Sequence, residues 1–174
     1  MYEELIISGL GGQGIVLAGS LLAQAAIVEG KEVSGLPSYS GEVRGGASAY
    51  SLIISAEEIT SPIATELTTL IAMHPPFLVR YEPLIRAGGL LLVNSSLIYD
   101  KPVRQDLEVI NIAATQIANT LGDTRVANMV ILGVYVTKTK IITMNSLFIA
   151  LEYFKKDTTL NKKALEEGAK LIGN

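Results

Sequence analysis

The sequence has no cysteine, and His74 is its only histidine. Without a thiol, the chain can form no disulfide, hold no iron–sulfur cluster through thiolates and use no thiol as a nucleophile. A single histidine, with no second histidine or cysteine, is too little for a transition-metal site. Because His74 stands directly before two prolines, we expect it at the end of a strand. The sequence therefore predicts no catalytic residue and no metal ligand in this chain.

Charged residues are also scarce: they make up 18% of the chain, against about 25% in ordinary soluble domains. Hydrophobic residues make up 49%. The net charge is −3 and the basic residues are scattered, so no nucleic-acid surface is predicted. Residues 5–28 carry no charge, a length that could span a membrane. They contain five glycines, however, which favour a strand, a turn and a helix instead. Glu3 and Glu4 stand where a signal peptide would be basic.

We therefore expect a cytoplasmic protein without a membrane segment. A low charged fraction then has a different explanation, namely that other chains cover part of the surface, because subunit contacts favour apolar over charged residues.

Short apolar runs alternate with longer helical ones, which is typical of α/β layering. Strands are predicted at residues 5–7, 32–34, 67–73, 90–94 and 107–112, with an added strand or hairpin at 48–55. Helices are predicted at residues 15–28, 76–86 and 128–137, the second of them ended by Gly88 and Gly89. The last third is predicted to be helical, with Asn161 capping the final helix. The expected fold is one domain, residues 1–174, of three layers around a mostly parallel, Rossmann-like sheet.

The first glycine-rich loop places Gly9, Gly11 and Gly14 in a G-x-G-x-x-G spacing between a strand and a helix. Free N–H groups at a helix start favour anions. A dinucleotide site would also have an acidic residue at the end of the second strand, about 20 residues further on. Glu32 stands at the start of that strand, so NAD binding is disfavoured. Phosphate binding and a tight turn that lets strand and helix approach both remain open.

The second loop, residues 37–46, reads Pro-Ser-Tyr-Ser-Gly-Glu-Val-Arg-Gly-Gly. It places Tyr39, Glu42 and Arg44 after the second strand, at the edge where open α/β sheets bind ligands and partners. The Arg44 guanidinium, beside two glycines, could meet a carboxylate or a phosphate without crowding. The alternative is a Glu42–Arg44 surface pair that braces a turn, and the residues alone do not decide between them.

Taken together, the segments resemble the gamma subunit, or gamma domain, of 2-oxoacid:ferredoxin (or flavodoxin) oxidoreductases. The matching segments are residues 9–14 with the alanine-rich stretch that follows, 37–46, 59–62, 88–96, 113–122 and 126–133. They run in order across nearly the whole chain, which is far more specific than one glycine motif.

The resemblance implies a hetero-oligomeric enzyme that oxidatively decarboxylates a 2-oxoacid to its acyl-CoA and reduces ferredoxin. Thiamine diphosphate, Mg²⁺ and the iron–sulfur clusters would belong to partner chains, and coenzyme A would be a co-substrate. The expected partners are alpha and beta subunits and ferredoxin, with a ferredoxin-like delta subunit as a further candidate. This chain would bind no cofactor and would not be active alone. The sequence of the second loop resembles that of family members that act on 2-oxoglutarate or on branched-chain 2-oxoacids. Of these substrates, we expect 2-oxoglutarate.

Both loops would then face the cleft of the complex and could receive coenzyme A. The amide of Asn128 would orient the second loop or a ligand, or cap a helix start. The candidate residues are Gly9, Gly11, Gly12, Gln13, Gly14, Ser38, Tyr39, Glu42, Arg44, Gly45, Gly46 and Asn128. Two other interpretations remain: a free-standing nucleotide-binding protein, and a purely structural assembly subunit whose loops contact only partner chains.

Overall fold

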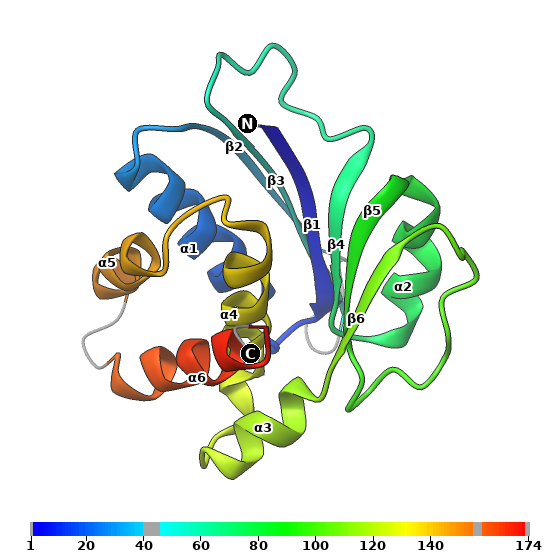
Figure 1. Cartoon of the computed structure of the whole chain (residues 1–174), viewed down its shortest axis with the longest axis vertical. Helices are drawn as coiled ribbons and strands as arrows, with labels where there is room; N and C mark the ends of the chain where they lie inside the picture. Colours follow the sequence, from blue (N-terminus) through cyan, green and yellow to red (C-terminus); the bar gives the residue numbers. More distant parts are fainter. Residues whose placement is uncertain (1, 40–45, 155–157, 173–174) are drawn as a thin grey trace.

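The computed structural model describes residues 2–39, 46–154 and 158–172. Its strands form one six-stranded sheet in the order β2-β3-β1-β4-β5-β6 (Figure 1). The strands are β1 Tyr2–Leu10, β2 Glu32–Tyr39, β3 Ala47–Ser55, β4 Leu67–Ala72, β5 Ile85–Asn94 and β6 Glu108–Ile112. The helices are α1 Ile15–Val28, α2 Pro75–Tyr81, α3 Ala114–Thr120, α4 Ala127–Thr139, α5 Met144–Phe154 and α6 Thr159–Lys170, with 3-10 turns η1 Glu82–Leu84 and η2 Thr124–Val126.

β3 is the added strand that the sequence predicted, and it lies between β1 and β2. It pairs antiparallel with both neighbours, whereas β1, β4, β5 and β6 pair in parallel. β2 therefore points the same way as β1, and the prediction of a mostly parallel sheet is confirmed. As a consequence, the carboxyl ends of all the parallel strands, and the start of β3, lie at one edge of the sheet.

Helices cover both faces of the sheet, which gives the predicted three layers. α1 and the C-terminal helices α3 to α6 lie over one face, while α2 and η1 cover part of the other (Figure 1). The larger core lies under the first group and contains most of the buried α4 side chains. α4 is apolar on every side, as expected for a helix with neighbours all round, and it contacts α6, α3, α5 and β5. No helix among the described residues is both long and apolar enough to cross a membrane.

α4 and α6 cross at two glycines. A methyl group on Gly133 would collide with the backbone oxygen of Leu165, and one on Gly168 would collide with the backbone oxygen of Val130. Each glycine therefore lets the opposite helix backbone come within contact distance. This crossing holds α6 onto the core helix α4.

A group of hydrogen bonds around Glu29 joins the end of α1 to the start of α5. The Glu29 carboxylate accepts hydrogen bonds from Thr143 N (2.6 Å) and Ser146 Oγ (2.7 Å), and Lys31 Nζ donates to its other oxygen (2.8 Å). Lys31 Nζ also donates to the Ile141 backbone oxygen. Glu29 thus supplies a negative charge at the amino-terminal end of α5, where the helix dipole favours it.

Three sequence predictions were wrong in detail. The helix predicted over residues 76–86 ends at Tyr81, because Pro83 has no N–H and restricts the residue before it, and β5 already begins at Ile85. Gly88 and Gly89 therefore lie inside β5, within a bulge between the β4–β5 pairs, and do not end a helix. Asn161 does not cap α6, since the capping position is Thr158. β2 also runs on to Tyr39, so residues 37–39 are strand and not loop.

Candidate functional site

The first glycine loop, residues 11–14, joins β1 to α1 at the carboxyl edge of the sheet. Gly12 and Gly14 have φ angles of 95° and 71°, in the left-handed region that favours glycine. A side chain at Gly14 would collide with the Asn128 amide, and one at Gly9 would collide with Gln13 and Met73. Space around Gly12, in contrast, is open. Gly9, near the end of β1, and Gly14 thus serve close packing, and Gly12 leaves a surface that a ligand could approach.

Gln13 braces this loop. Its side-chain oxygen accepts from Leu10 N (2.7 Å), its backbone N–H donates to Leu10 O (3.1 Å), and its Nε2 donates to Met73 O (3.4 Å). The loop is therefore fastened to the ends of both β1 and β4. Gln13, predicted as a ligand-facing residue, has its amide committed to the protein itself.

Replacing Gln13 by alanine should lower the free energy of unfolding by about 1–2 kcal/mol, because the N–H of Leu10 loses its partner in a partly buried loop. Chemical denaturation monitored by circular dichroism would measure the change. Gln116→Ala, at an exposed position of α3, is the control and should change stability by less than about 0.5 kcal/mol. Equal stability of the two variants would show that the hydrogen bonds of the Gln13 side chain do not contribute to the free energy of unfolding.

Asn128 fastens the other side of the same loop. Its Nδ2 donates to Gly14 O (3.0 Å) and its Oδ1 accepts from Met129 N (2.9 Å), and the residue is only 4% exposed. The sequence left open whether this amide orients the second loop or a ligand, or caps a helix. The structure shows it holding the first loop instead, and the capping position of α4 is Val126.

Among the described residues, a hydrogen bond from Gly11 N to Gly46 O (2.9 Å) joins the two glycine loops. Gly46 is buried, while Ser38 and Tyr39 are exposed at the end of β2, Tyr39 by 66%. Glu42, Arg44 and Gly45 lie outside the described residues, so their contacts stay a prediction. The structure thus brings the start and the end of the predicted second-loop site to the same edge as the first loop.

Two adjoining hollows open beside the first loop, and both are lined by Gly12 and Arg125. The smaller has a volume of ≈ 180 Å³ and is also lined by Gln13, Met73, Leu97, Thr115, Thr124 and Ala127. The larger has a volume of ≈ 310 Å³ and is also lined by Gly14, Leu17, Asp123, Val126, Asn128, Leu160 and Asn161. Residues far apart in sequence are thus gathered around Gly12.

Arg125 is the charged residue that the sequence reasoning missed. Its Nε donates to both Asp123 carboxylate oxygens (3.0 and 2.9 Å) and its Nη2 to one of them (2.7 Å), and its side chain is 83% exposed. The hydrogen bonds and charge of Asp123 raise the pKa of Arg125, so the guanidinium keeps its charge. An Asp-x-Arg turn directly before a buried helix was a signal that could have drawn attention to it.

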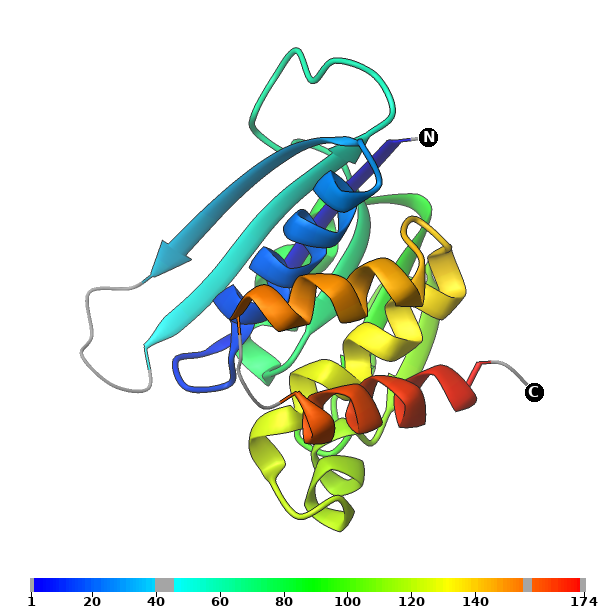
Figure 2. The same ribbon diagram turned by 90° about the vertical axis from the view of Figure 1, so that its left-hand side faces the viewer.

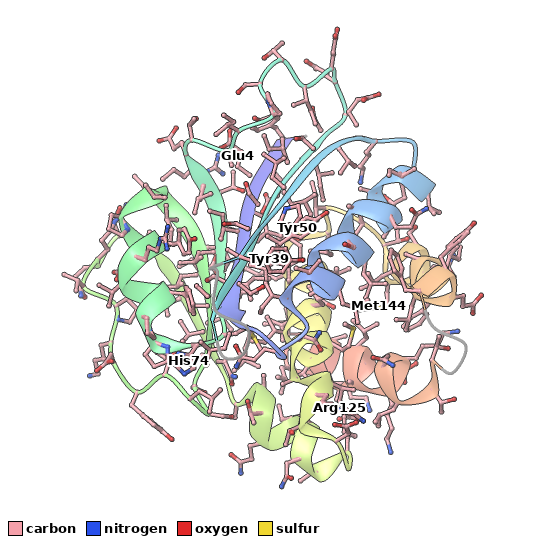
Figure 3. All side chains as sticks on the ribbon, turned by 180° about the vertical axis from the view of Figure 1, so that it is seen from behind. Glu4, Tyr39, Tyr50, His74, Arg125 and Met144 are labelled. Carbon is pink, nitrogen blue, oxygen red and sulfur yellow. The ribbon has the colours of Figure 1, made fainter. Side chains whose placement is uncertain are left out.

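His74 follows the end of β4 and starts α2, as the sequence predicted, and its Nδ1 is buried without a hydrogen-bond partner in the described part of the chain. Figure 3 shows His74 and Arg125 in the lower half of the molecule, with Glu4 at the opposite end of the sheet. Over residues 2–39, 46–154 and 158–172, no three His, Asp or Glu side chains gather in a way that could hold a metal ion. Among the described residues, the arrangement offers open backbone around Gly12 and the exposed guanidinium of Arg125, which suit binding of a polar or anionic ligand.

Comparison with known proteins gives a consistent result. The family described as pyruvate ferredoxin/flavodoxin oxidoreductase matches residues 4–171. The chain is 34% identical, over 181 aligned positions, to the 2-oxoglutarate synthase subunit KorC of Methanothermobacter marburgensis, covering 99% of this chain and 97% of that protein.

Two solved structures show the same fold. The gamma subunit of keto/oxoacid ferredoxin oxidoreductase from Geobacter sulfurreducens PCA superimposes with a TM-score of 0.84 at 32% identity, over 97% of this chain and 96% of that one. A 2-oxoglutarate:ferredoxin oxidoreductase from Magnetococcus marinus superimposes with a TM-score of 0.90 over 98% of this chain, which corresponds to 31% of that longer chain. At 21% identity, this second likeness concerns the fold alone.

Proposed function

Because the chain belongs to the pyruvate ferredoxin/flavodoxin oxidoreductase family and is a gamma subunit of the 2-oxoacid ferredoxin oxidoreductase type, we propose that its complex acts on 2-oxoglutarate. The complex would oxidatively decarboxylate 2-oxoglutarate, transfer the acyl group to coenzyme A and pass the electrons to ferredoxin. The observation that carries this proposal is the likeness to a 2-oxoglutarate synthase subunit over nearly the full length of both chains.

Partner chains would hold the cofactors. Because this chain has no cysteine, iron–sulfur clusters held by thiolates must lie in other subunits, and we assign thiamine diphosphate and Mg²⁺ to them as well. Residues 1–174 would act as one gamma domain, assembled with alpha and beta subunits, with a ferredoxin-like delta subunit as a further candidate. The chain would be inactive alone, and the complex would work in the cytoplasm, where coenzyme A and ferredoxin are found.

We further propose that the glycine loops form part of the coenzyme A surface. Two observations support this: the Gly11–Gly46 hydrogen bond joins the loops, and Gly12 leaves open space at the start of α1. A helix start and an arginine suit the diphosphate and the 3′-phosphate of coenzyme A. The proposed cleft-facing residues are Gly9, Gly11, Gly12, Gln13, Gly14, Ser38, Tyr39, Glu42, Arg44, Gly45, Gly46 and Asn128.

Arg44→Ala in the complete enzyme is expected to raise the KM for coenzyme A about tenfold, because one charge-assisted hydrogen bond to a phosphate contributes about 1.5–3 kcal/mol. Steady-state kinetics at saturating 2-oxoglutarate would measure the change. Lys163→Ala, which removes an exposed charge from α6, is the matched control. If the Arg44 variant kept both the wild-type coenzyme A dependence and the assembly of the complex, the assigned role of Arg44 would be wrong.

The proposed function as a whole is tested by purifying the tagged chain from its host under anaerobic conditions. Iron-rich partner chains and coenzyme A-dependent dye reduction should be recovered with it, with 2-oxoglutarate used in preference to pyruvate and 2-oxoisovalerate. Preference for another 2-oxoacid would overturn the substrate. Recovery of the chain alone, metal-free and inactive, would overturn the subunit assignment and favour a free-standing nucleotide-binding protein.

A purely structural role is the second candidate, and specific contacts favour it. Gln13 and Asn128 direct their amides at the protein's own backbone, as scaffold residues do. Under this alternative, Tyr39→Ala would weaken assembly of the complex and leave the kinetics of the assembled enzyme unchanged. A raised KM for coenzyme A in the assembled variant would exclude it.

A further inference from the structure

The smaller hollow lies where the winding of the sheet reverses. β1 and β4 are parallel neighbours in the middle of the sheet, but the helices that follow them, α1 and α2, lie on opposite faces (Figure 1). Open α/β sheets bind ligands in the crevice that such a reversal leaves beyond the carboxyl ends of the strands. The hollow is lined by Gly12 and Gln13, which follow β1, and by Met73, which follows β4. The fold therefore places this hollow where a ligand is expected.

The other two parallel strands also lead to this hollow. Leu97 follows β5 and Thr115 follows β6, and both residues line it. The remaining wall comes from Thr124 and Arg125 in η2 and from Ala127 at the start of α4. In Figure 2, the loop after β1 (blue) and the start of α4 (yellow) lie in the lower half of the molecule, opposite the N-terminus. The ends of all four parallel strands thus contribute to one site.

The walls of the smaller hollow suit an aromatic ring. Met73, Leu97 and Ala127 give it apolar surface. The Gln13 amide is directed at the protein itself, because its oxygen accepts from Leu10 N and its Nε2 donates to Met73 O. The volume is ≈ 180 Å³, compared with the roughly 150 Å³ of an apolar cavity that binds benzene. An aromatic ring therefore has enough room in this hollow.

Arg125 gives the hollow a flat surface whose charge is balanced. Its Nε and Nη2 donate to the Asp123 carboxylate, so the two side chains form an ion pair without net charge. A guanidinium that is hydrogen-bonded along its edge can still stack on an aromatic ring with its face, and the Arg125 side chain is 83% exposed. A phosphate, in contrast, would be repelled by the Asp123 carboxylate. The pair therefore favours a neutral, flat ligand.

Thr115 adds a hydrogen-bond donor to this apolar frame. Its Oγ1 accepts from Asn94 Nδ2 (2.9 Å), which leaves the hydroxyl hydrogen for another acceptor. Asn94 is fully buried at the end of β5, so the position of the hydroxyl is fixed by the sheet. The ring nitrogens of a purine are acceptors, whereas the ring of a phenylalanine side chain has no such atom. The donor thus favours a nucleobase over an apolar side chain of a partner.

We propose that the smaller hollow binds a purine ring, which stacks on the Arg125 guanidinium and accepts a hydrogen bond from the Thr115 hydroxyl. The open space beside Gly12 gives the attached sugar room to leave the hollow. The purine could be the adenine of coenzyme A or that of a free adenine nucleotide. Its assignment to coenzyme A rests on the proposed function, whereas the purine site itself rests on the geometry of the hollow alone.

The purine site is tested on the full chain by saturation-transfer-difference NMR, which detects weak binding. Adenosine, which carries no phosphate, is the probe, and ribose 5-phosphate, which carries no base, is the comparison ligand. Adenosine is expected to bind, with the strongest transfer to its ring protons, and ribose 5-phosphate is expected to give no signal. Absence of adenosine binding, or equal binding of ribose 5-phosphate, would overturn the site.

Arg125→Ala is expected to weaken adenosine binding about fivefold, because the stacking contact with the guanidinium is lost. The side chain is exposed, so the variant should fold as the wild type does. Arg86→Ala is the matched control: it makes the same substitution at an exposed position near the start of β5, at the opposite edge of the sheet, and should leave adenosine binding unchanged.

Leu97→Ala gives a second measurement on a different wall of the hollow. It is expected to weaken adenosine binding about threefold to tenfold, because apolar surface that contacts the ring is removed. Leu171→Ala, at a position that is 52% exposed, is its control. Wild-type affinity for adenosine in both Arg125→Ala and Leu97→Ala would overturn the site.

The source of the purine is distinguished in the complete enzyme with coenzyme A and 4′-phosphopantetheine, which lacks the adenosine part. If the hollow holds the adenine of coenzyme A, Arg125→Ala raises the KM for coenzyme A about fivefold and leaves that for 4′-phosphopantetheine unchanged. An unchanged KM for coenzyme A would overturn that assignment and leave a free adenine nucleotide as the ligand. Because the NMR experiment needs no turnover, failure of the proposed function would not be mistaken for failure of the site.

Discussion

Gly168→Ala is expected to lower the free energy of unfolding by about 3 kcal/mol, the upper part of the usual range for overpacking a tight core. The added methyl group would stand against the backbone oxygen of Val130 on α4. A backbone atom cannot move aside as the end of a flexible side chain can, so the two helices would have to separate. Helix propensity alone would favour alanine over glycine by about 1 kcal/mol. The loss expected from the collision is therefore opposite in sign to the change that propensity predicts.

Urea denaturation of the wild type and the variant would measure this effect. Glu166→Ala places an alanine two residues earlier, at an exposed position of the same helix, and should change the stability by less than about 0.5 kcal/mol. Gly133→Ala, on the opposite side of the crossing, should behave like Gly168→Ala, because its methyl group would meet Leu165 O. If either glycine variant were as stable as the wild type, the two backbones would not be in contact.

The sequence predicted the sheet well because its signals are local. Residues 48–55 are rich in β-forming residues and follow a glycine-rich loop and not a helix, which indicated an added strand or hairpin, and the structure shows the strand β3 there. The glycine spacing of the first loop likewise located the turn between β1 and α1. The boundary between α2 and β5 was missed because the predicted helix was ended at Gly88 and Gly89, although Pro83, about two turns into that helix, is the stronger stop signal.

The candidate site was harder to predict, because its contacts join residues far apart in the chain. Asn128 was identified, but its partner Gly14 lies 114 positions away, and no local pattern indicates that pair. Asn161 was assigned to a helix cap on its residue type, whereas its place beside Gly12 and Arg125 depends on how α6 packs on α4. Gly133 and Gly168 show the same limit, since only the crossing distinguishes them from unfavourable glycines in helix interiors.

Glu29→Gln is expected to cost about 1–2 kcal/mol of stability at neutral pH. Burial by itself raises the pKa of Glu29, but hydrogen bonds from Lys31, from the Thr143 backbone and from Ser146 outweigh it and lower the pKa from 4.5 to about 2. A difference of about 2.5 pKa units would correspond to roughly 3 kcal/mol of preference for the charged form in the folded state. Because the carboxylate is partly exposed, solvent screening reduces the expected contribution to about 1–2 kcal/mol. Glutamine keeps the shape of the side chain but neither the charge nor one of the acceptors.

The pH dependence separates this effect from a simple loss of packing. Because the folded-state pKa is depressed, the contribution of Glu29 is complete above pH 4.5 and is lost as the pH falls through about 2. The difference in unfolding free energy between wild type and Glu29→Gln should therefore shrink from about 1–2 kcal/mol at pH 7 to nearly zero at pH 2. Denaturant titrations across that range would measure it.

Glu152→Gln removes a carboxylate that pairs with Lys162 but is 64% exposed, and it should differ from the wild type by less than about 1 kcal/mol throughout. A difference for Glu29→Gln that stayed constant with pH would mean that its carboxylate stabilises the fold by packing and not by its charge at the start of α5.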